Sequence, residues 1–294
     1  RGRDGSGGTD RPRGRDGSGD TDRFRGHERG EGPRRPARDG KPSESRPGPR
    51  ADSRRSRQRE EPERVRPGLS AAADEPPTPA DFDEALLPSA VKAELKGLSR
   101  EVADIVGAHL VAAGELIDEN PELAYRHAEA ARRRAARLPV VREAAAEAAY
   151  AAGEYAVALR EFRALRRMLG SVDYLAVIAD CERALGRPRA ALDTLREADP
   201  ATLSANQRIE ALIVEAGARS DLGQQGEAIR LLENAIRTAK GPRLALGRLR
   251  FAYAELLVAA GHAASAKEWL RAVANFDPDD ELGASVRLAE LEEE

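Results

Sequence analysis

Four glycines in the second half of the chain occupy the same place in a repeated pattern, and this repetition constrains the fold most. An alanine lies seven residues before each glycine, another lies five residues after it, and a large apolar residue follows four positions later. Self-similarity at a period of 20–50 residues is the signature of a repeat architecture. The aligned positions are Ala146, Gly153, Ala158 and Phe162; Ala179, Gly186, Ala191 and Leu195; Ala216, Gly223, Ala228 and Leu232; Ala254, Gly261, Ala266 and Leu270.

The residue types in these columns predict helix hairpins. Two antiparallel helices that pack closely need a small residue on each side of their crossing, which the two alanines supply. The glycine can leave the first helix with a positive φ at no steric cost. One hairpin cannot bury its own apolar face, so successive hairpins must stack. We therefore expect an all-α fold, an α-solenoid of stacked helix hairpins.

Helix-end signals and the boundaries of the repeats agree with this interpretation. Asn120-Pro121 predicts an N-cap followed by proline in the first turn, and Ser204 with Gln207 predicts a capping box. Gly241-Pro242 predicts the end of one helix and the start of the next. No alternating β-branched segment occurs, so we expect no sheet. The helical repeat domain is predicted over residues 89–294, with a polar capping helix at 281–294.

Residues 1–80 differ from the rest in composition and charge. They are rich in Arg, Gly and Pro, and Phe24 is their only aromatic residue. This stretch carries 20 basic and 15 acidic residues, whereas the remainder carries 28 and 36. So little apolar surface cannot offset the backbone entropy lost on folding. We predict a disordered Arg/Gly/Pro-rich arm over residues 1–80.

The repeat resembles the tetratricopeptide repeat (TPR), a helix–turn–helix unit of about 34 residues. Residues 151–165 look like the second half of that unit, and residues 259–278 end in a proline as the family's repeat does. A degenerate unit is expected at 102–137. As a whole, the chain resembles actinobacterial TPR proteins with an Arg/Gly-rich N-terminus. It departs from the family early in the first helices, where a large aromatic residue is replaced by Arg142, Leu175, Leu212 and Arg250.

The resemblance implies a right-handed superhelix whose first helices line a concave groove. We expect this groove to mix acidic with apolar side chains and to favour a basic or apolar peptide; the alternative is that these residues are only solvated. The predicted groove residues are Glu143, Glu147, Tyr150, Asp173, Val177, Asp180, Glu210, Ile213, Phe251 and Glu255.

No residue pattern indicates catalysis, a cofactor or a metal. The histidines, His27, His109, His127 and His262, share no metal-ligand spacing, so structural or solvated roles are expected. Cys181 has no histidine at helical spacing and is interpreted as a packed thiol. The many Glu/Arg pairs are interpreted as solvated pairs along helix surfaces. We expect a protein that is not an enzyme.

The preferred function is a protein-interaction scaffold. The alternative is a nucleic-acid-associated protein that uses the Arg/Gly-rich arm, although this arm carries nearly as many acids as bases. No apolar run of about 18 residues is present, so no membrane span is expected. A single cysteine fits a reducing compartment, and a cytoplasmic location is predicted.

Overall fold

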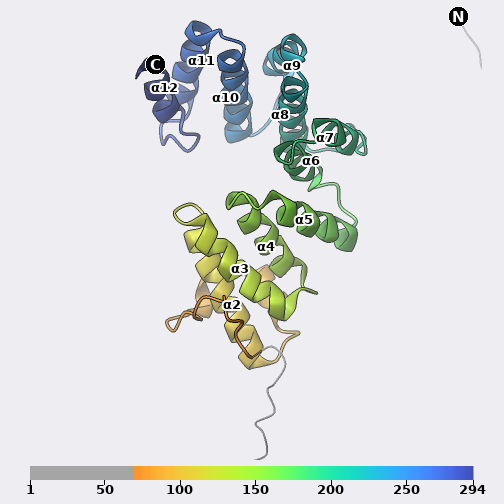
Figure 1. Cartoon of the computed structure of the whole chain (residues 1–294), viewed down its shortest axis with the longest axis vertical. Coiled ribbons are helices and arrows are strands. Elements are labelled where there is room, and N and C mark those ends of the chain that lie inside the picture. The colour runs from red at the N-terminus through yellow and green to blue at the C-terminus, as the bar shows by residue number, and fades with distance from the viewer. Residues whose placement is uncertain (1–68, 294) are drawn as a thin grey trace, which may run out of the picture. The chain divides into compact units, whose positions relative to one another are not determined.

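The computed structural model describes residues 69–293, and the described residues form helices and turns without a strand (Figure 1). The predicted all-α class is therefore confirmed for this part of the chain. Most of the predicted arm, residues 1–68, lies outside the described residues. The helices are a short 3₁₀ turn η1 (Glu84–Leu86), then α1 (Ser89–Leu95), α2 (Arg100–Leu116), α3 (Pro121–Ala135), α4 (Pro139–Ala151), α5 (Tyr155–Leu169), α6 (Leu175–Ala184), α7 (Pro188–Leu195), α8 (Ala205–Asp221), α9 (Gln225–Thr238), α10 (Arg243–Ala259), α11 (Ala263–Phe276) and α12 (Ala284–Glu293).

From α2 onward each helix packs against the next in the chain, as consecutive hairpins require. The hairpins are α2/α3, α4/α5, α6/α7, α8/α9 and α10/α11. First helices of neighbouring hairpins also touch, as α6 does with α8 and α8 with α10 (Figure 1). This sequential pairing is the arrangement of a helical repeat array.

The four aligned glycines each close a hairpin by the same turn. Their φ angles are 75°, 73°, 77° and 78° for Gly153, Gly186, Gly223 and Gly261. In each turn the amide after the glycine donates to a carbonyl five residues earlier, as from Glu154 to Ala149 at 2.8 Å. This bond marks a Schellman C-cap, in which a left-handed glycine satisfies the last carbonyls of the helix.

The paired alanines are all fully buried, as residues at close helix crossings are expected to be. Ala146 and Ala158 have no exposed surface, and neither do the corresponding pairs in the other three hairpins. Ala124, Ala128 and Ala131 are equally buried, so α2 and α3 form the expected earlier unit. Of the large apolar column, only Leu195 is half-buried rather than buried.

The predicted helix caps are present. The Asn120 side chain accepts a hydrogen bond from the amide of Leu123 at 3.1 Å, with Pro121 in the first turn of α3. Ser204 and Gln207 form both bonds of a capping box at the start of α8. At the other end of the domain, α12 buries Ala284 and Leu291 against the last hairpin.

Arg142 and Arg250 stand where the TPR family has a large aromatic residue, and both make contacts with neighbouring helices. The Arg142 guanidinium pairs with Glu161 and donates to the carbonyl of Ala136 at 2.7 Å. The Arg250 guanidinium lies 4.6 Å from the centroid of the Phe276 ring, a cation–π contact. Both arginines therefore still fill the space between helices.

Packed structure begins before residue 80, the predicted boundary of the arm. We call residues 69–87 the strap; they run along α2 and α3 ahead of the first α-helix. The ion pair of Glu75 with Arg134 is 2.6 Å long, and both side chains are almost completely buried. The composition of residues 69–80 gives no indication of this contact, because Arg134 lies more than fifty residues after Glu75 in the sequence.

Candidate functional site

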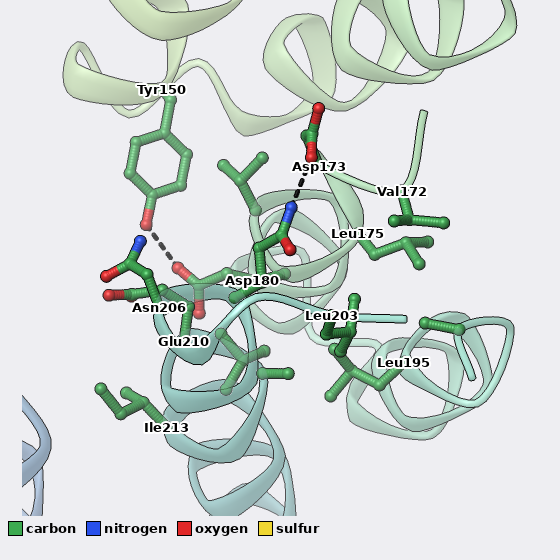
Figure 2. Close-up of a pocket in the computed structure, with 16 residues that line it drawn as sticks. Tyr150, Val172, Asp173, Leu175, Asp180, Leu195, Leu203, Asn206, Glu210 and Ile213 are labelled. Atoms are coloured by element: carbon green, nitrogen blue, oxygen red, sulfur yellow. Dashed lines mark hydrogen bonds between the residues drawn. The ribbon is translucent and has the colours of Figure 1, made fainter. Parts of the chain in front are cut away.

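A cavity of about 380 Å³ lies where α4, α6 and α8 meet, and we call it the main cavity. Figure 2 shows its lining side chains converging from these helices, from Leu195 at the end of α7 and from the segments before α6 and α8. Six predicted groove residues line it: Tyr150, Asp173, Val177, Asp180, Glu210 and Ile213.

The main cavity joins apolar walls to negative charge. Leu175, Leu195, Leu203, Ile213 and other aliphatic residues form most of its surface. Three carboxylates, on Asp173, Asp180 and Glu210, also face it, and the lining contains no Lys, Arg or His. A ligand that fits this surface must bury apolar groups and tolerate or neutralise negative charge.

Tyr150 and Asp180 join α4 to α6 at the rim of the main cavity. The Tyr150 hydroxyl donates to Asp180 (Figure 2), which also accepts from Arg183 at 2.8 Å. Burial and the hydrogen bond to Asp180 raise the pKa of the Tyr150 phenol, so it stays protonated as a donor. These contacts fix the carboxylate in place before any ligand arrives.

The other two carboxylates of the main cavity are also held. Asp173, before α6, accepts from the amide group of Gln207 on α8 (Figure 2). Glu210 accepts from the Nε of Arg248 at 2.8 Å, which ties α8 to α10. The acidic groups are therefore positioned by bonds between neighbouring first helices, and these bonds shape the cavity wall.

A second cavity, of about 450 Å³, lies between α6, α8 and α10. It contains the predicted groove residues Phe251 and Glu255, and shares Ile213 with the main cavity. Arg183 lines it and links the two cavities, since its guanidinium contacts Asp180 on one side and Asp221, at 2.8 Å, on the other. A side chain at Gly217 would clash with that guanidinium, because a Cβ would lie 2.5 Å from its central carbon.

Glu143 and Glu147 lie on α4 outside the lining of these two cavities. The carboxylate of Glu143 accepts from the Tyr174 hydroxyl at 2.6 Å. The Glu147 side chain remains accessible to solvent, yet partial desolvation by the surrounding protein raises its pKa. The negative charge of Glu143 raises it further. Sequence reasoning thus placed these two acids on the correct helix but beside the cavities.

Several cavity residues were not predicted, although the sequence carries a signal for some of them. Asn206 and Gly217 lie on the same face of α8 as the predicted Glu210 and Ile213, because the four positions follow one another at steps of three or four. The loop residues Val172 and Leu203 carry no such periodicity. Their place in the main cavity depends on how α6 and α8 pack.

The thiol and two of the imidazoles considered from the sequence lie in the packed interior of the domain. Burial raises the pKa of the Cys181 thiol to about 12, which keeps it protonated. His109 and His127, 18 residues apart, meet in the interior with their Nδ1 atoms 3.0 Å apart. No group of three or more potential metal-ligating side chains occurs among residues 69–293. Within the same residues, no helix is both long and apolar enough to cross a membrane.

No protein-family model matches the chain, and no curated protein is significantly similar to it. The fold and the cavities are therefore the basis for considering function.

Proposed function

We propose that the chain is a protein-interaction scaffold of the TPR type, and that its two linked cavities bind a peptide segment with apolar and basic side chains. The observation that carries this proposal is the lining of the main cavity. It combines an aliphatic surface with Asp173, Asp180 and Glu210. Arg183 and Arg248, outside the lining, pair with Asp180 and Glu210, whereas Asp173 is held by the neutral side chains of Ser171 and Gln207.

The chemistry of this lining favours one kind of peptide. Long basic side chains have aliphatic stems that pack on apolar surface while their charged ends reach carboxylates. Each exposed ion pair contributes only about 0–1 kcal/mol, so affinity requires several contacts along the groove. The carboxylates would repel phosphate groups, so the main cavity gives no support to the nucleic-acid alternative.

A random peptide library tests the proposal directly. We expect peptides selected on the full chain to combine Lys or Arg with aliphatic residues. They should bind Asp173→Arg roughly tenfold more weakly, because this change replaces a carboxylate with a positive charge. A tenfold loss of affinity corresponds to about 1.4 kcal/mol. Isothermal titration with synthetic copies of the selected peptides measures this loss.

Asp193→Arg is the matched control, since it makes the same charge change at an exposed carboxylate that lines neither cavity. The control should bind the peptides as the wild type does. Equal binding to the wild type and both variants would place the peptide site elsewhere, and failure to select any peptide would count against the scaffold function itself.

A further inference from the structure

The strap, residues 69–87, is attached to α2 and α3 in the manner of a bound peptide. Between residues 69 and 83 the only backbone–backbone hydrogen bond in the described structure is local, from Glu75 to the carbonyl of Ala72 at 3.0 Å. No backbone–backbone bond links the strap to α2 or α3. Side chains therefore hold it in place.

Three arginines of α3 supply most of these contacts. The Arg133 guanidinium donates twice to the Asp74 carboxylate, at 3.0 and 2.9 Å. Arg126 donates to the Asp74 carbonyl at 2.8 Å. Arg134 pairs with Glu75 at 2.6 Å, and this pair is buried. Bidentate arginine–carboxylate pairs have the geometric specificity that peptide recognition uses.

A histidine and a threonine complete the acidic part of the contact. The Nε2 of His109 lies 3.5 Å from the Glu75 carboxylate and 3.4 Å from the Thr78 hydroxyl. The Nδ1 atoms of His109 and His127 lie 3.0 Å apart and share one hydrogen bond, whose direction follows the tautomers of the two rings. The histidine pair thus lies directly against the acidic segment.

The aromatic ring of Phe82 fills a notch formed by a glycine. A Cβ at Gly107 would lie 2.8 Å from the Phe82 ring and 3.1 Å from Leu87. Gly107 lies inside α2, where glycine costs about 1 kcal/mol relative to alanine. Its presence there is explained by the ring that it admits.

We propose that this face of α2 and α3 is a second interaction surface, which recognises an acidic segment followed by an aromatic side chain, and that the strap occupies it as an internal competitor. The chemistry of the partner is that of the strap itself: adjacent carboxylates for Arg133 and Arg134, then a ring for the Gly107 notch. This inference is independent of the groove function, because it involves different helices and ligands of opposite charge.

A labelled peptide with the sequence of residues 69–87 tests the proposal. The receptor is the full chain with Asp74→Ala and Phe82→Ala, which weaken the tethered strap. We expect saturable binding at least about tenfold tighter than to the wild type, because a tethered competitor acts at an effective concentration near millimolar. Fluorescence anisotropy measures both affinities.

Changes on both sides of the contact establish specificity. Peptides with Asp74→Ala or Phe82→Ala should each bind several-fold more weakly. Arg133→Asp in the weakened receptor should abolish binding, and a peptide with Asp74→Arg should restore it. Arg166→Asp is the control, because Arg166 pairs with Glu197 on another hairpin and should leave binding unchanged.

Three results would overturn the proposal. One is absence of saturable binding to a weakened receptor whose circular dichroism matches the wild type. Another is equal displacement of the peptide by an oligothymidylate, which would make the surface a general anion site. The third applies if the weakened receptor unfolds. The wild type is then titrated with peptide into the millimolar range, and lack of saturation there would also overturn the proposal.

Discussion

Some charged residues are buried although their spacing along the sequence is typical of solvent-exposed pairs on a helix surface. Glu161 is 1% exposed and contacts Arg132, Arg142 and Arg160. Glu182 is similarly buried and pairs with arginines of α5 and of the following turn. The interpretation of such residues as solvated pairs along one helix is therefore wrong for these two. A buried carboxylate needs several partners, and neighbouring helices supply them.

His109 makes the stability of the fold depend on pH. Burial and the neighbouring His127 lower its pKa to about 4, from an ordinary value of 6.5. The unfolded chain therefore takes up a proton between these values that the folded chain does not. Stability should be full above about pH 6.5 and should fall as the pH drops towards 4, by at most about 1.4 kcal/mol per pH unit for one group.

Chemical denaturation at a series of pH values measures this slope. The charged groups facing His109 are Glu75, Arg134 and His127, while Arg126 faces His127. Ion pairing lowers the pKa of Glu75 despite its burial, so its contribution is lost only below its ordinary value of 4.5. His109→Gln should reduce the slope below pH 6.5, and the remainder belongs to His127, whose pKa burial also lowers. An unchanged slope in this variant would show that other groups produce it.

At the scale of elements, each hairpin depends on one turn and one helix crossing. The Schellman turn at the glycine reverses the chain, and the paired alanines let the two helices approach closely. In the α6/α7 hairpin these alanines are Ala179 and Ala191, which pack in one cluster with Val214 and Ala218 of the next hairpin. The same small residues therefore serve packing within a hairpin and between hairpins.

Replacing Ala191 with leucine should overpack this crossing. We expect a loss of about 1–3 kcal/mol in the free energy of unfolding, because Ala191 is fully buried and three further carbons must displace its neighbours. Ala156→Leu is the control, since Ala156 lies on the exposed side of α5. Urea denaturation of both variants checks the difference. Equal stability of the two would contradict the repeat alignment.

At the scale of the whole described domain, the stability of each hairpin depends on its contacts with the adjacent hairpins. Each hairpin of residues 100–276 contacts the next one in the chain, and the last contacts α12, so local damage should spread mainly to adjacent units. The last hairpin is covered by α12, which buries Leu291. The strap covers the other end, where Phe82 and Leu87 join the cluster around Val106 and Val141.

Leu291→Ala should therefore loosen one end of the domain selectively. We expect a loss of about 2–3 kcal/mol, at the low end for a buried leucine because α12 is terminal. Hydrogen exchange should accelerate in α10, α11 and α12 while α2 to α5 keep their protection. Val286→Ala, at a side chain that is 62% exposed, is the control. Uniform acceleration along the chain would instead indicate a single cooperative unit.

The sequence by itself determined the features that depend on local backbone chemistry. The left-handed glycines, the Asn120 and Ser204 caps and the buried alanine columns are all readable from residue type and spacing. They are so because helix ends and close crossings admit few residue types. Six residues that the TPR resemblance implied for the groove also line the main cavity, five of them on first helices and Asp173 just before α6.

Tertiary structure alone decided the contacts between residues distant in sequence. It brought His109 to His127, placed three arginines around Glu161 and fixed the strap to α3 through Glu75 and Arg134. These side chains carry no local signal, because a long polar residue is equally compatible with solvent and with a partner. Which of the two it meets depends on how neighbouring helices pack, since burial makes a charged group require a partner.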